Sequence, residues 1–245
     1  NADNLGSTID LKILNYIIDE DIPFLMEVTA KTPVDTKGGV LCQEKDQIKL
    51  LEIADVPPEY VVEFCGNEKF NFFNTNNIWV NLVSLKQKLK EGPLDLGLIV
   101  NRKQVKKQSV LQLETAVGSA FNSFPDAMGM NVPRSRFLPV KRTSDLLLVQ
   151  SDLFSLNRGT LKRDQGVARS DLPQINLKDP FNDLKEYQQR IPVRPDIAEL
   201  DSLELKGEVR FKGKVTLKGN VRLVSHKKSI RIPKGAVLEN KTVES

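Results

Sequence analysis

Residues 203–226 read Leu-Glu-Leu-Lys-Gly-Glu, Val-Arg-Phe-Lys-Gly-Lys, Val-Thr-Leu-Lys-Gly-Asn and Val-Arg-Leu-Val-Ser-His, which are four hexads in register. The first and third positions of each hexad are apolar, and three of the four hexads carry Lys-Gly at positions four and five. Inward aliphatic side chains on alternate residues, with a glycine at the corner, are typical of a parallel β-helix whose coils stack their apolar sides. An antiparallel meander with glycine turns is the alternative. We predict a parallel β-helix over residues 201–245.

The basic side chains of this repeat lie outside the apolar positions, and we expect them to face solvent. They are Lys206, Arg210, Lys212, Lys214, Lys218 and Arg222. A nucleic-acid surface would interleave aromatic side chains for stacking, but only Phe211 is present, at an inward position. The formal net charge of +4, with 28% charged residues, is too weak a bias to indicate nucleic acid. We therefore predict no nucleic-acid partner.

Upstream of the hexads, residues 157–200 are poor in apolar side chains and are interrupted by four prolines. Only residues 182–190 have a helical pattern. We predict a linker layer with one helix, packed loosely against its neighbours.

Residues 1–156 alternate between helical and strand patterns. The predicted helices cover residues 7–18, 57–64, 80–90, 114–124 and 143–154. The predicted strands cover residues 24–29, 40–43, 47–56, 70–73 and 96–100. Ser7 or Thr8 would cap the first helix. This alternation predicts an α/β sheet.

The composition excludes several classes of function. Cys42 and Cys65 form no CxxC pair, and His226 is the only histidine, so zinc sites, disulfide frameworks and histidine-based nucleophilic catalysis are disfavoured. We detect no signal peptide, and no apolar run approaches the roughly 20 residues of a membrane helix. We expect a cytoplasmic protein without a membrane partner. Because the chain begins at Asn1 rather than Met, we also expect a fragment.

Two polar stretches near the start of the chain are candidate ligand sites. Asp3, in Asn-Ala-Asp-Asn, can coordinate Mg²⁺ together with phosphate oxygens, or it can cap the following helix. The pair Gly38-Gly39 lets backbone amides approach a sugar or phosphate, but a hairpin turn requires the same residues.

Two further stretches carry polar groups at predicted strand ends. Residues 73–77 read Phe-Asn-Thr-Asn-Asn before Trp79, and amide side chains suit the hydroxyls of a neutral sugar. A cap for a helix starting near Trp79 would explain only one asparagine. Lys141 ends the run Asn-Val-Pro-Arg-Ser-Arg-Phe-Leu-Pro-Val-Lys beside a predicted helix start. There it can meet a polyphosphate together with free helix amides, or it can decorate a basic surface strand.

Together these stretches resemble UTP:glucose-1-phosphate uridylyltransferase of the eukaryotic type, in its C-terminal portion. The matching segments are residues 1–6, 37–39, 51–54, 73–77, 112–116 and 131–141, with residues 235–241 closing the match. The resemblance is weakest between residues 157 and 189. It implies an incomplete Rossmann-like nucleotidyltransferase domain with a mixed sheet over residues 1–156, a linker layer over 157–200, and a left-handed parallel β-helix over 201–245.

The resemblance also implies a reaction and its residues. UTP and glucose 1-phosphate would give UDP-glucose and pyrophosphate by in-line transfer with Mg²⁺, so catalysis would rest on positioning and charge neutralisation. Lys141 matches the catalytic lysine that meets the nucleotide phosphates, and Asp3 matches the aspartate that binds metal and phosphate. The implied substrate contacts are Asn1, Ala2, Asp3, Gly39, Glu52, Asn74 and Asn76.

The sequence departs from the family in one respect. The family's nucleotide half, with its glycine-rich loop, a second lysine and a Gly-His-Gly element, precedes the counterpart of Asn1, so we expect no turnover from this chain alone. Two hypotheses remain: the chain is part of a working uridylyltransferase, or it is a truncated, non-catalytic fragment that binds sugar or oligomerises. Assembly would use the β-helix. The number of copies and the acceptance of galactose 1-phosphate stay open.

Overall fold

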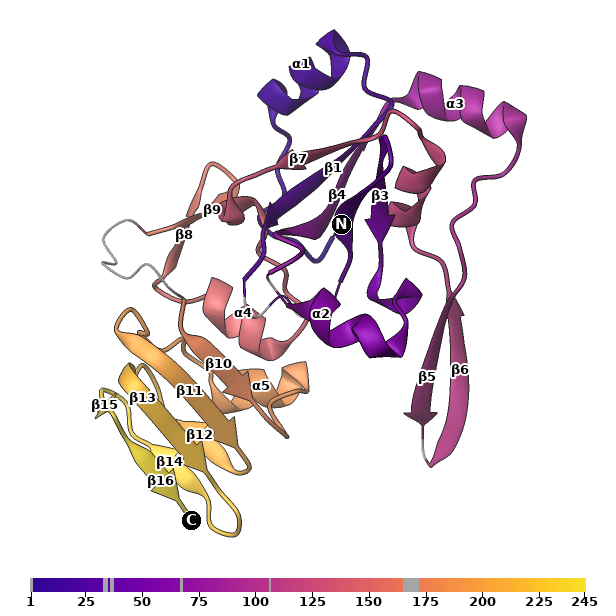
Figure 1. Cartoon of the computed structure of the whole chain (residues 1–245). Coiled ribbons are helices and arrows are strands. Elements are labelled where there is room, and N and C mark those ends of the chain that lie inside the picture. The colour runs from indigo at the N-terminus through magenta and orange to yellow at the C-terminus, as the bar shows by residue number, and fades with distance from the viewer. Residues whose placement is uncertain (1, 33–34, 36–37, 67, 106, 165–171) are drawn as a thin grey trace. The chain divides into compact units, whose positions relative to one another are not determined.

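The computed structural model describes residues 2–32, 35, 38–66, 68–105, 107–164 and 172–245. The chain divides into two compact units (Figure 1). Residues 7–137 form the first unit, and residues 2–6 join residues 138–245 in the second. The predicted division at residues 156 and 200 groups the chain differently, because it follows composition rather than contacts, and it stays a prediction.

The first unit is built on a five-stranded mixed sheet, as predicted. Its strands are β1 (Phe24–Ala30), β2 (Val40–Glu44), β3 (Gln47–Leu51), β4 (Phe72–Val80) and β7 (Met128–Asn131), in the order β3-β2-β4-β1-β7. The central strand β1 pairs antiparallel with β4 and parallel with β7. Phe24 and Met26 face one hydrophobic cluster and Leu25 faces another, so apolar side chains cover both faces of β1.

Three short α-helices lie in the described part of this unit. They are α1 (Leu11–Asp19), α2 (Val61–Cys65) and α3 (Leu82–Glu91). The predicted start of the first helix was wrong, because Asp10 rather than Ser7 or Thr8 accepts the capping hydrogen bond, from the N–H of Lys12 at 2.9 Å. The third helix begins after Asn81, whose side chain caps it, so Trp79 lies in β4 and not at a helix start.

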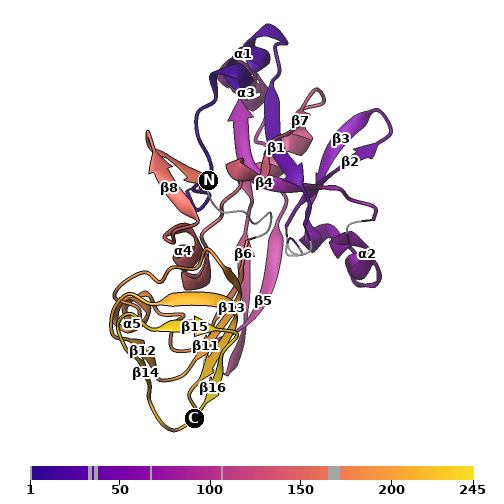
Figure 2. The ribbon, with the colours of Figure 1, turned by 90° about the vertical axis from the view of Figure 1, so that its left-hand side faces the viewer.

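The segment from 96 to 124 differs most from prediction. The strand expected to be buried is one arm of an exposed antiparallel hairpin, β5 (Ile99–Val105) with β6 (Gln108–Glu114), which extends away from the sheet of its unit (Figures 1 and 2). Lys107, at φ +69°, lies in its turn. A 3₁₀ helix, η3 (Val117–Ser123), replaces the α-helix predicted over 114–124, and its Phe121 packs against Phe24 with ring centroids 5.8 Å apart.

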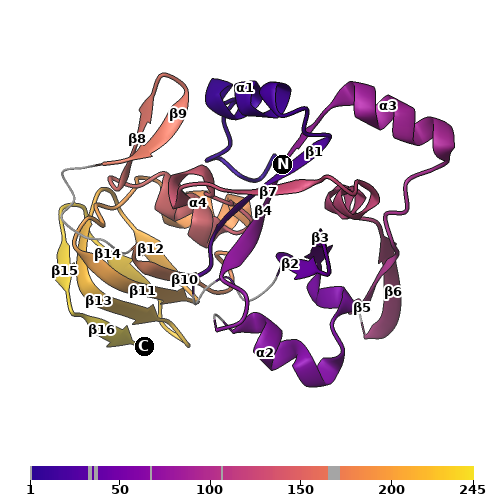
Figure 3. The ribbon, with the colours of Figure 1, turned by 45° about the horizontal axis from the view of Figure 1, so that its top comes forward.

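The second unit contains helices, one hairpin and parallel strands. The helices are α4 (Thr143–Val149) and α5 (Leu184–Arg190), and the hairpin is β8 (Phe154–Asn157) with β9 (Thr160–Arg163). The parallel strands are β10 (Gln174–Leu177), β11 (Leu200–Lys206), β12 (Val209–Phe211), β13 (Thr216–Val224), β14 (Ile230–Ile232), β15 (Val237–Glu239) and β16 (Thr242–Glu244). Figure 3 shows β11, β13 and β16 side by side. The antiparallel meander is thereby excluded for these strands.

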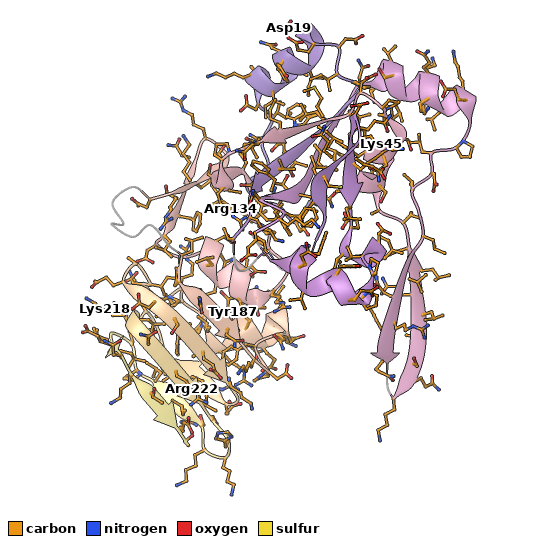
Figure 4. All side chains as sticks on the ribbon, viewed as in Figure 1. Asp19, Lys45, Arg134, Tyr187, Lys218 and Arg222 are labelled. Carbon is orange, nitrogen blue, oxygen red and sulfur yellow. The ribbon has the colours of Figure 1, made fainter. Side chains whose placement is uncertain are left out.

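The hexads place their apolar positions as predicted. All eight are buried: Leu203, Leu205, Val209, Phe211, Val215, Leu217, Val221 and Leu223. Leu203 pairs with Val221, 18 residues further along, so three hexads separate stacked strands. The basic side chains lie on the outside, where Lys218 meets Glu199 at 2.7 Å and Arg222 meets Glu204 at 3.4 Å (Figure 4).

The prediction of loose packing over residues 157–200 was wrong. Strand β10 extends the parallel sheet by pairing with β11, and Phe181, Tyr187 and Ile197 are buried in the same hydrophobic core as the hexads. Several apolar residues of this segment therefore belong to the core, although Leu172, Leu184 and Val193 are exposed. No helix among the described residues has both the length and the apolar character to cross a membrane.

Candidate functional site

A bulge interrupts the pairing of β4 with β1 at the predicted asparagine cluster. Glu27 pairs with Asn77 and the next residue, Val28, pairs with Asn74, so Thr75 and Asn76 are extra residues on β4. Asn76 has φ +59°, in the left-handed region that asparagine tolerates better than most residues. The Oδ1 atom of Asn74 accepts a hydrogen bond from the N–H of Asn76 at 2.7 Å. The bulge thus turns Asn76 outward.

Gly39 and Glu52 adjoin this bulge. The carbonyl of Gly39 accepts a hydrogen bond from the N–H of Asn74 at 2.9 Å, and the side chain of Asn74 hydrogen-bonds to Glu52. A Cβ atom on residue 39 would lie 2.6 Å from Oε1 of Glu52, so a larger residue there would displace the Glu52 side chain. The structure therefore brings together four predicted residues, Gly39, Glu52, Asn74 and Asn76. We call them the sugar site, after the ligand that the sequence predicts for them.

Glu52 has an altered proton affinity. Burial of its carboxyl raises the pKa of Glu52, and the negative charge of Asp55 adds to this rise, while the hydrogen bond from Asn74 opposes it. Glu52 also lines a cavity of about 230 Å³, with Asp55, Asp95, Ser119 and Asn122. Asn74 and Asn76 do not line this cavity, so the sugar site lies at its edge.

One neighbour of the sugar site carried no signal in the sequence. A Cβ atom on Gly118, in η3, would lie 3.2 Å from Oδ1 of Asn76, so this glycine leaves room beside the outward asparagine. Nothing in the local pattern around Gly118 indicated this close approach, because it depends on how η3 packs against the sheet.

The buried carboxylate of Glu27, next to the bulge, was not predicted from the sequence. Glu27 is only 1% exposed, and it accepts hydrogen bonds from Arg136, from Nε1 of Trp79 at 2.8 Å and from Nδ2 of Asn77 at 3.3 Å. A single acidic residue inside the apolar strand Phe-Leu-Met-Glu-Val-Thr-Ala was the signal that could have revealed it, since an isolated buried charge needs partners.

Arg134, which lies with Arg136 in the motif of residues 131–141, binds Asp35. Nη1 and Nη2 of Arg134, which is labelled in Figure 4, donate to the two carboxylate oxygens of Asp35 at 2.7 and 2.9 Å. Burial alone would raise the pKa of Asp35, but the hydrogen bonds from Arg134 and Thr32 outweigh burial and lower that pKa. Asp35 is therefore a charged, structural carboxylate.

Asp3 and Lys141 lie together in the second unit. We call them the phosphate pair, after the ligand that the sequence predicts for them. The carbonyl of Asp3 accepts a hydrogen bond from the N–H of Val140 at 2.8 Å, and Oδ1 of buried Asn4 accepts one from Leu138 at 2.7 Å. These bonds hold Nζ of Lys141 3.7 Å from Oδ2 of Asp3. The Lys141 side chain is 70% exposed. Ala2 is exposed beside Asp3, and Asn1 lies outside the described residues.

The phosphate pair fits a divalent cation in one respect. The Oδ1 atom of Asp3 is buried and has no hydrogen-bond partner among the described residues. Mg²⁺ commonly binds through one or two carboxylates and completes its shell with water and phosphate oxygens. A single carboxylate with an unused oxygen suits this mode. The described part of the chain contains no cluster of three or more His, Cys, Asp or Glu side chains for an all-protein metal site.

The contribution of free helix amides beside Lys141 stays a prediction, although two amides just before the helix are already paired. Oδ2 of Asp145 accepts hydrogen bonds from the N–H groups of both Lys141 and Arg142, each at 2.9 Å. Because α4 caps its own start with Asp145, those two amides are not available to a phosphate. The Lys141 side chain places a positive charge 3.7 Å from Oδ2 of Asp3.

The fold and these sites define an α/β protein with a mixed sheet, a stack of parallel strands, and polar sites built from amide, carboxylate and ammonium groups. The family profile described as UTP--glucose-1-phosphate uridylyltransferase matches residues 1–218. The chain therefore belongs to the UTP--glucose-1-phosphate uridylyltransferase family.

Relatives and solved structures agree with this assignment. The chain is 47% identical over 244 residues to the UTP--glucose-1-phosphate uridylyltransferase of Astragalus penduliflorus and 48% identical to that of Hordeum vulgare. In both cases 99% of this chain covers 52% of the relative, so the chain spans about half the length of the curated relatives it matches.

Several solved structures cover the whole chain, and two of them illustrate the match. The UDP-glucose phosphorylase of Trypanosoma brucei is 35% identical, with a TM-score of 0.84, and 55% of that protein is matched. A mutant UDP-glucose pyrophosphorylase of Leishmania major, in complex with UDP-glucose, is 33% identical, with a TM-score of 0.83 and 56% of it matched. The fold of this chain is thus that of the matched half of these proteins.

Proposed function

We propose that this chain supplies the sugar-binding and part of the phosphate-binding machinery of an enzyme that forms UDP-glucose and pyrophosphate from UTP and glucose 1-phosphate. Family membership supports the reaction, and the Leishmania major structure contains UDP-glucose. The observation that carries the proposal is the convergence of Gly39, Glu52, Asn74 and Asn76, which come from distant parts of the first unit. The cytoplasmic location stays a prediction.

The sugar site has the chemistry that a hexose requires. Asn76 offers one donor and one acceptor group from an exposed bulge, and Glu52 offers carboxylate oxygens. Sugar hydroxyls both donate and accept hydrogen bonds, so this mixture fits a neutral sugar better than a charged ligand. Gly39 leaves room for the Glu52 carboxylate to lie against its backbone.

The phosphate pair would act on the reacting phosphates. An oxygen of the glucose 1-phosphate attacks the α-phosphorus of UTP, the new P–O bond forms, and the bond to the leaving pyrophosphate breaks. We assign Lys141 the role of neutralising phosphate charge with its exposed ammonium group. Asp3 would hold Mg²⁺ through its unpaired Oδ1, and Mg²⁺ would supply further positive charge to phosphate oxygens.

The parallel stack of the second unit has a proposed geometry and role of its own. We propose that it is a left-handed β-helix, which the hexads and the 18-residue spacing of paired strands support. We also propose that copies of the protein assemble through this stack. Light scattering behind a sizing column tests assembly, and a monomer at all concentrations would contradict it.

Turnover, we propose, also needs the part of the relatives that this chain does not match. The test joins the unmatched N-terminal part of the Hordeum vulgare relative to residue 1 and assays UDP-glucose pyrophosphorolysis by the chain alone and by the joined protein. We expect activity only from the joined protein. Activity of the chain alone would refute the need for the other part. A folded but inactive joined protein would contradict the proposed reaction and would favour a non-catalytic module that binds sugar or oligomerises.

A further inference from the structure

Arg136 and Glu27 form a buried ion pair beneath the bulge of β4. Nε of Arg136 donates to Oε2 of Glu27 at 2.9 Å, and Nη2 donates to Oε1 at 2.6 Å. Nη1 and Nη2 also donate to the hydroxyl and carbonyl of Thr8 at 3.1 and 2.9 Å. The Arg136 side chain is only 12% exposed. Arg136 lies in the motif of residues 131–141, which ends at Lys141.

Glu27 anchors the bulge on both sides of Asn76. Its backbone carbonyl accepts a hydrogen bond from Oγ1 of Thr75 at 2.7 Å, and its carboxylate accepts one from Nδ2 of Asn77 at 3.3 Å. The N–H of Asn77 in turn donates to Oγ1 of Thr75 at 3.2 Å. Asn76, with its left-handed φ, therefore lies between Thr75 and Asn77, which both hydrogen-bond to Glu27.

We propose that Arg136, acting through Glu27, is a positioning residue that holds Asn74 and Asn76 in place for the sugar. This inference rests on the function proposed above. A buried carboxylate without a partner would take up water or a proton, and either change would loosen its hold on Asn77. The ion pair thus connects a motif arginine to the outward asparagine.

The geometry explains why the residue is an arginine. Its planar fork reaches both carboxylate oxygens of Glu27 and still leaves N–H groups for Thr8. Lysine would keep the positive charge but has a single ammonium centre, so it cannot satisfy both partners in this geometry. Arg136→Lys therefore keeps the positive charge that neutralises Glu27 but removes the paired hydrogen bonds that orient its carboxylate.

The side chain of Trp79 can report on the orientation of Glu27. Trp79 is the only tryptophan of the chain, and its Nε1 donates to Oε1 of Glu27 at 2.8 Å. The indole N–H signal of Trp79 and the backbone amide signals of residues 74–77 can be followed by NMR without any ligand. A change in Glu27 orientation must move these signals.

The test compares the whole chain with Arg136→Lys and with a matched control, Arg190→Met. Arg190 is also a buried arginine with two carboxylate partners, Glu186 and Glu208, but it lies in the other unit. We expect Arg136→Lys to shift the Trp79 and bulge signals and to weaken glucose 1-phosphate binding by about tenfold or more, since small misplacements of binding groups are costly. Arg190→Met should lower stability and leave both readouts unchanged.

In the joined protein, Arg136→Lys should raise the KM for glucose 1-phosphate and leave the KM for UTP near its normal value. If Arg136→Lys does not fold, Thr75→Val decides the question, since it removes the hydroxyl anchor of the bulge and keeps the ion pair. Thr75→Ser keeps the hydroxyl and should restore binding.

Two outcomes separate this inference from the proposed function. Unchanged bulge signals and unchanged glucose 1-phosphate affinity in a folded Arg136→Lys or Thr75→Val chain would overturn the positioning role alone. Failure of the unaltered chain and of the unaltered joined protein to bind glucose 1-phosphate would overturn the proposed function, and the positioning role with it.

Discussion

The backbone of Gly39 lies against the carboxylate of Glu52, so closely that an added Cβ atom would stand 2.6 Å from Oε1. Gly39 does not have a left-handed φ, so its requirement for glycine is one of space rather than of backbone conformation. This contact joins the glycine pair and the glutamate that the sequence placed in separate motifs.

Gly39→Ala is therefore expected to displace the Glu52 carboxylate and to weaken glucose 1-phosphate binding by about tenfold. Isothermal calorimetry on the whole chain measures this. Gly129→Ala is the matched control, because its Cβ would press on a methyl group of Leu41 in the same sheet without touching the sugar site. Equal loss of affinity in the two variants would indicate a general disturbance of the sheet and contradict the prediction.

Lys141→Ala is expected to lower turnover by the joined protein by about 100-fold or more, since a charge aimed at reacting phosphates acts mainly in the transition state. Stability should change by less than about 1 kcal/mol, because Lys141 is exposed and its ion pair with Asp3 is long. Lys212→Ala, in the outer face of the hexads, is the control. Near-normal turnover by Lys141→Ala would remove Lys141 from the mechanism.

How much of this arrangement the sequence could predict depends on how local each signal is. The hexads repeat over a few residues, so their inward positions and parallel pairing followed directly from the pattern. The bulge at Asn76 did not, because it exists only through the register of β4 against β1. Asp3 and Lys141 are separated in the sequence by the whole first unit. Each could be proposed to bind phosphate from its local motif, but only the family resemblance placed the two at one site.

The wrong predictions for the first helix and for residues 96–100 also have local causes. Ile9 fits the apolar period of the first helix, but it is 83% exposed, because the aspartate after it is the stronger cap. The apolar residues at 96–100 suggested a buried strand, yet most of the hairpin that follows is exposed. Apolar content alone does not reveal whether a segment finds a partner within its own unit.

Asp3→Asn is expected to raise the Mg²⁺ concentration that gives half-maximal activity of the joined protein by about tenfold or more, since a neutral amide oxygen is a poorer ligand for a hard cation. Asp46→Asn, in the exposed turn between β2 and β3, should leave that concentration unchanged. Removal of divalent cations with EDTA should abolish activity in every variant. An unchanged Mg²⁺ requirement in Asp3→Asn would show that the metal is held elsewhere.

The two perturbed carboxylates of the first unit predict opposite effects of pH on stability. The pKa of Glu52 is raised on folding, so its contribution to stability is fully present below its unfolded value and is lost as pH rises through the folded one. The pKa of Asp35 is lowered, so its contribution is present above the unfolded value and is lost as pH falls through the folded one.

Urea unfolding between pH 3 and pH 7 checks these signs. Relative to the unaltered chain, Glu52→Gln should gain stability as pH rises above the ordinary Glu value of 4.5, because the variant has no buried charge to form. Asp35→Asn should lose stability at pH 7, by about 1 to 3 kcal/mol, and the loss should shrink towards pH 3. Parallel pH curves for the two variants would contradict at least one of the two assignments.

Gly207 tests the stacking of the hexads. It has φ +75°, and a Cβ atom there would collide with the backbone carbonyl of Ser225 in the next coil. Gly159 has a similar φ of +79° but open space around it. Alanine would be similarly strained at both positions, so the difference between Gly207→Ala and Gly159→Ala isolates the contact with Ser225.

We expect Gly159→Ala to lower the free energy of unfolding by about 1 kcal/mol and Gly207→Ala to lower it by several kcal/mol more, since a backbone neighbour cannot move aside as a side chain can. Equal free energies of unfolding would mean that the coils separate at this corner without penalty, and the close stacking of the hexads would have to be abandoned.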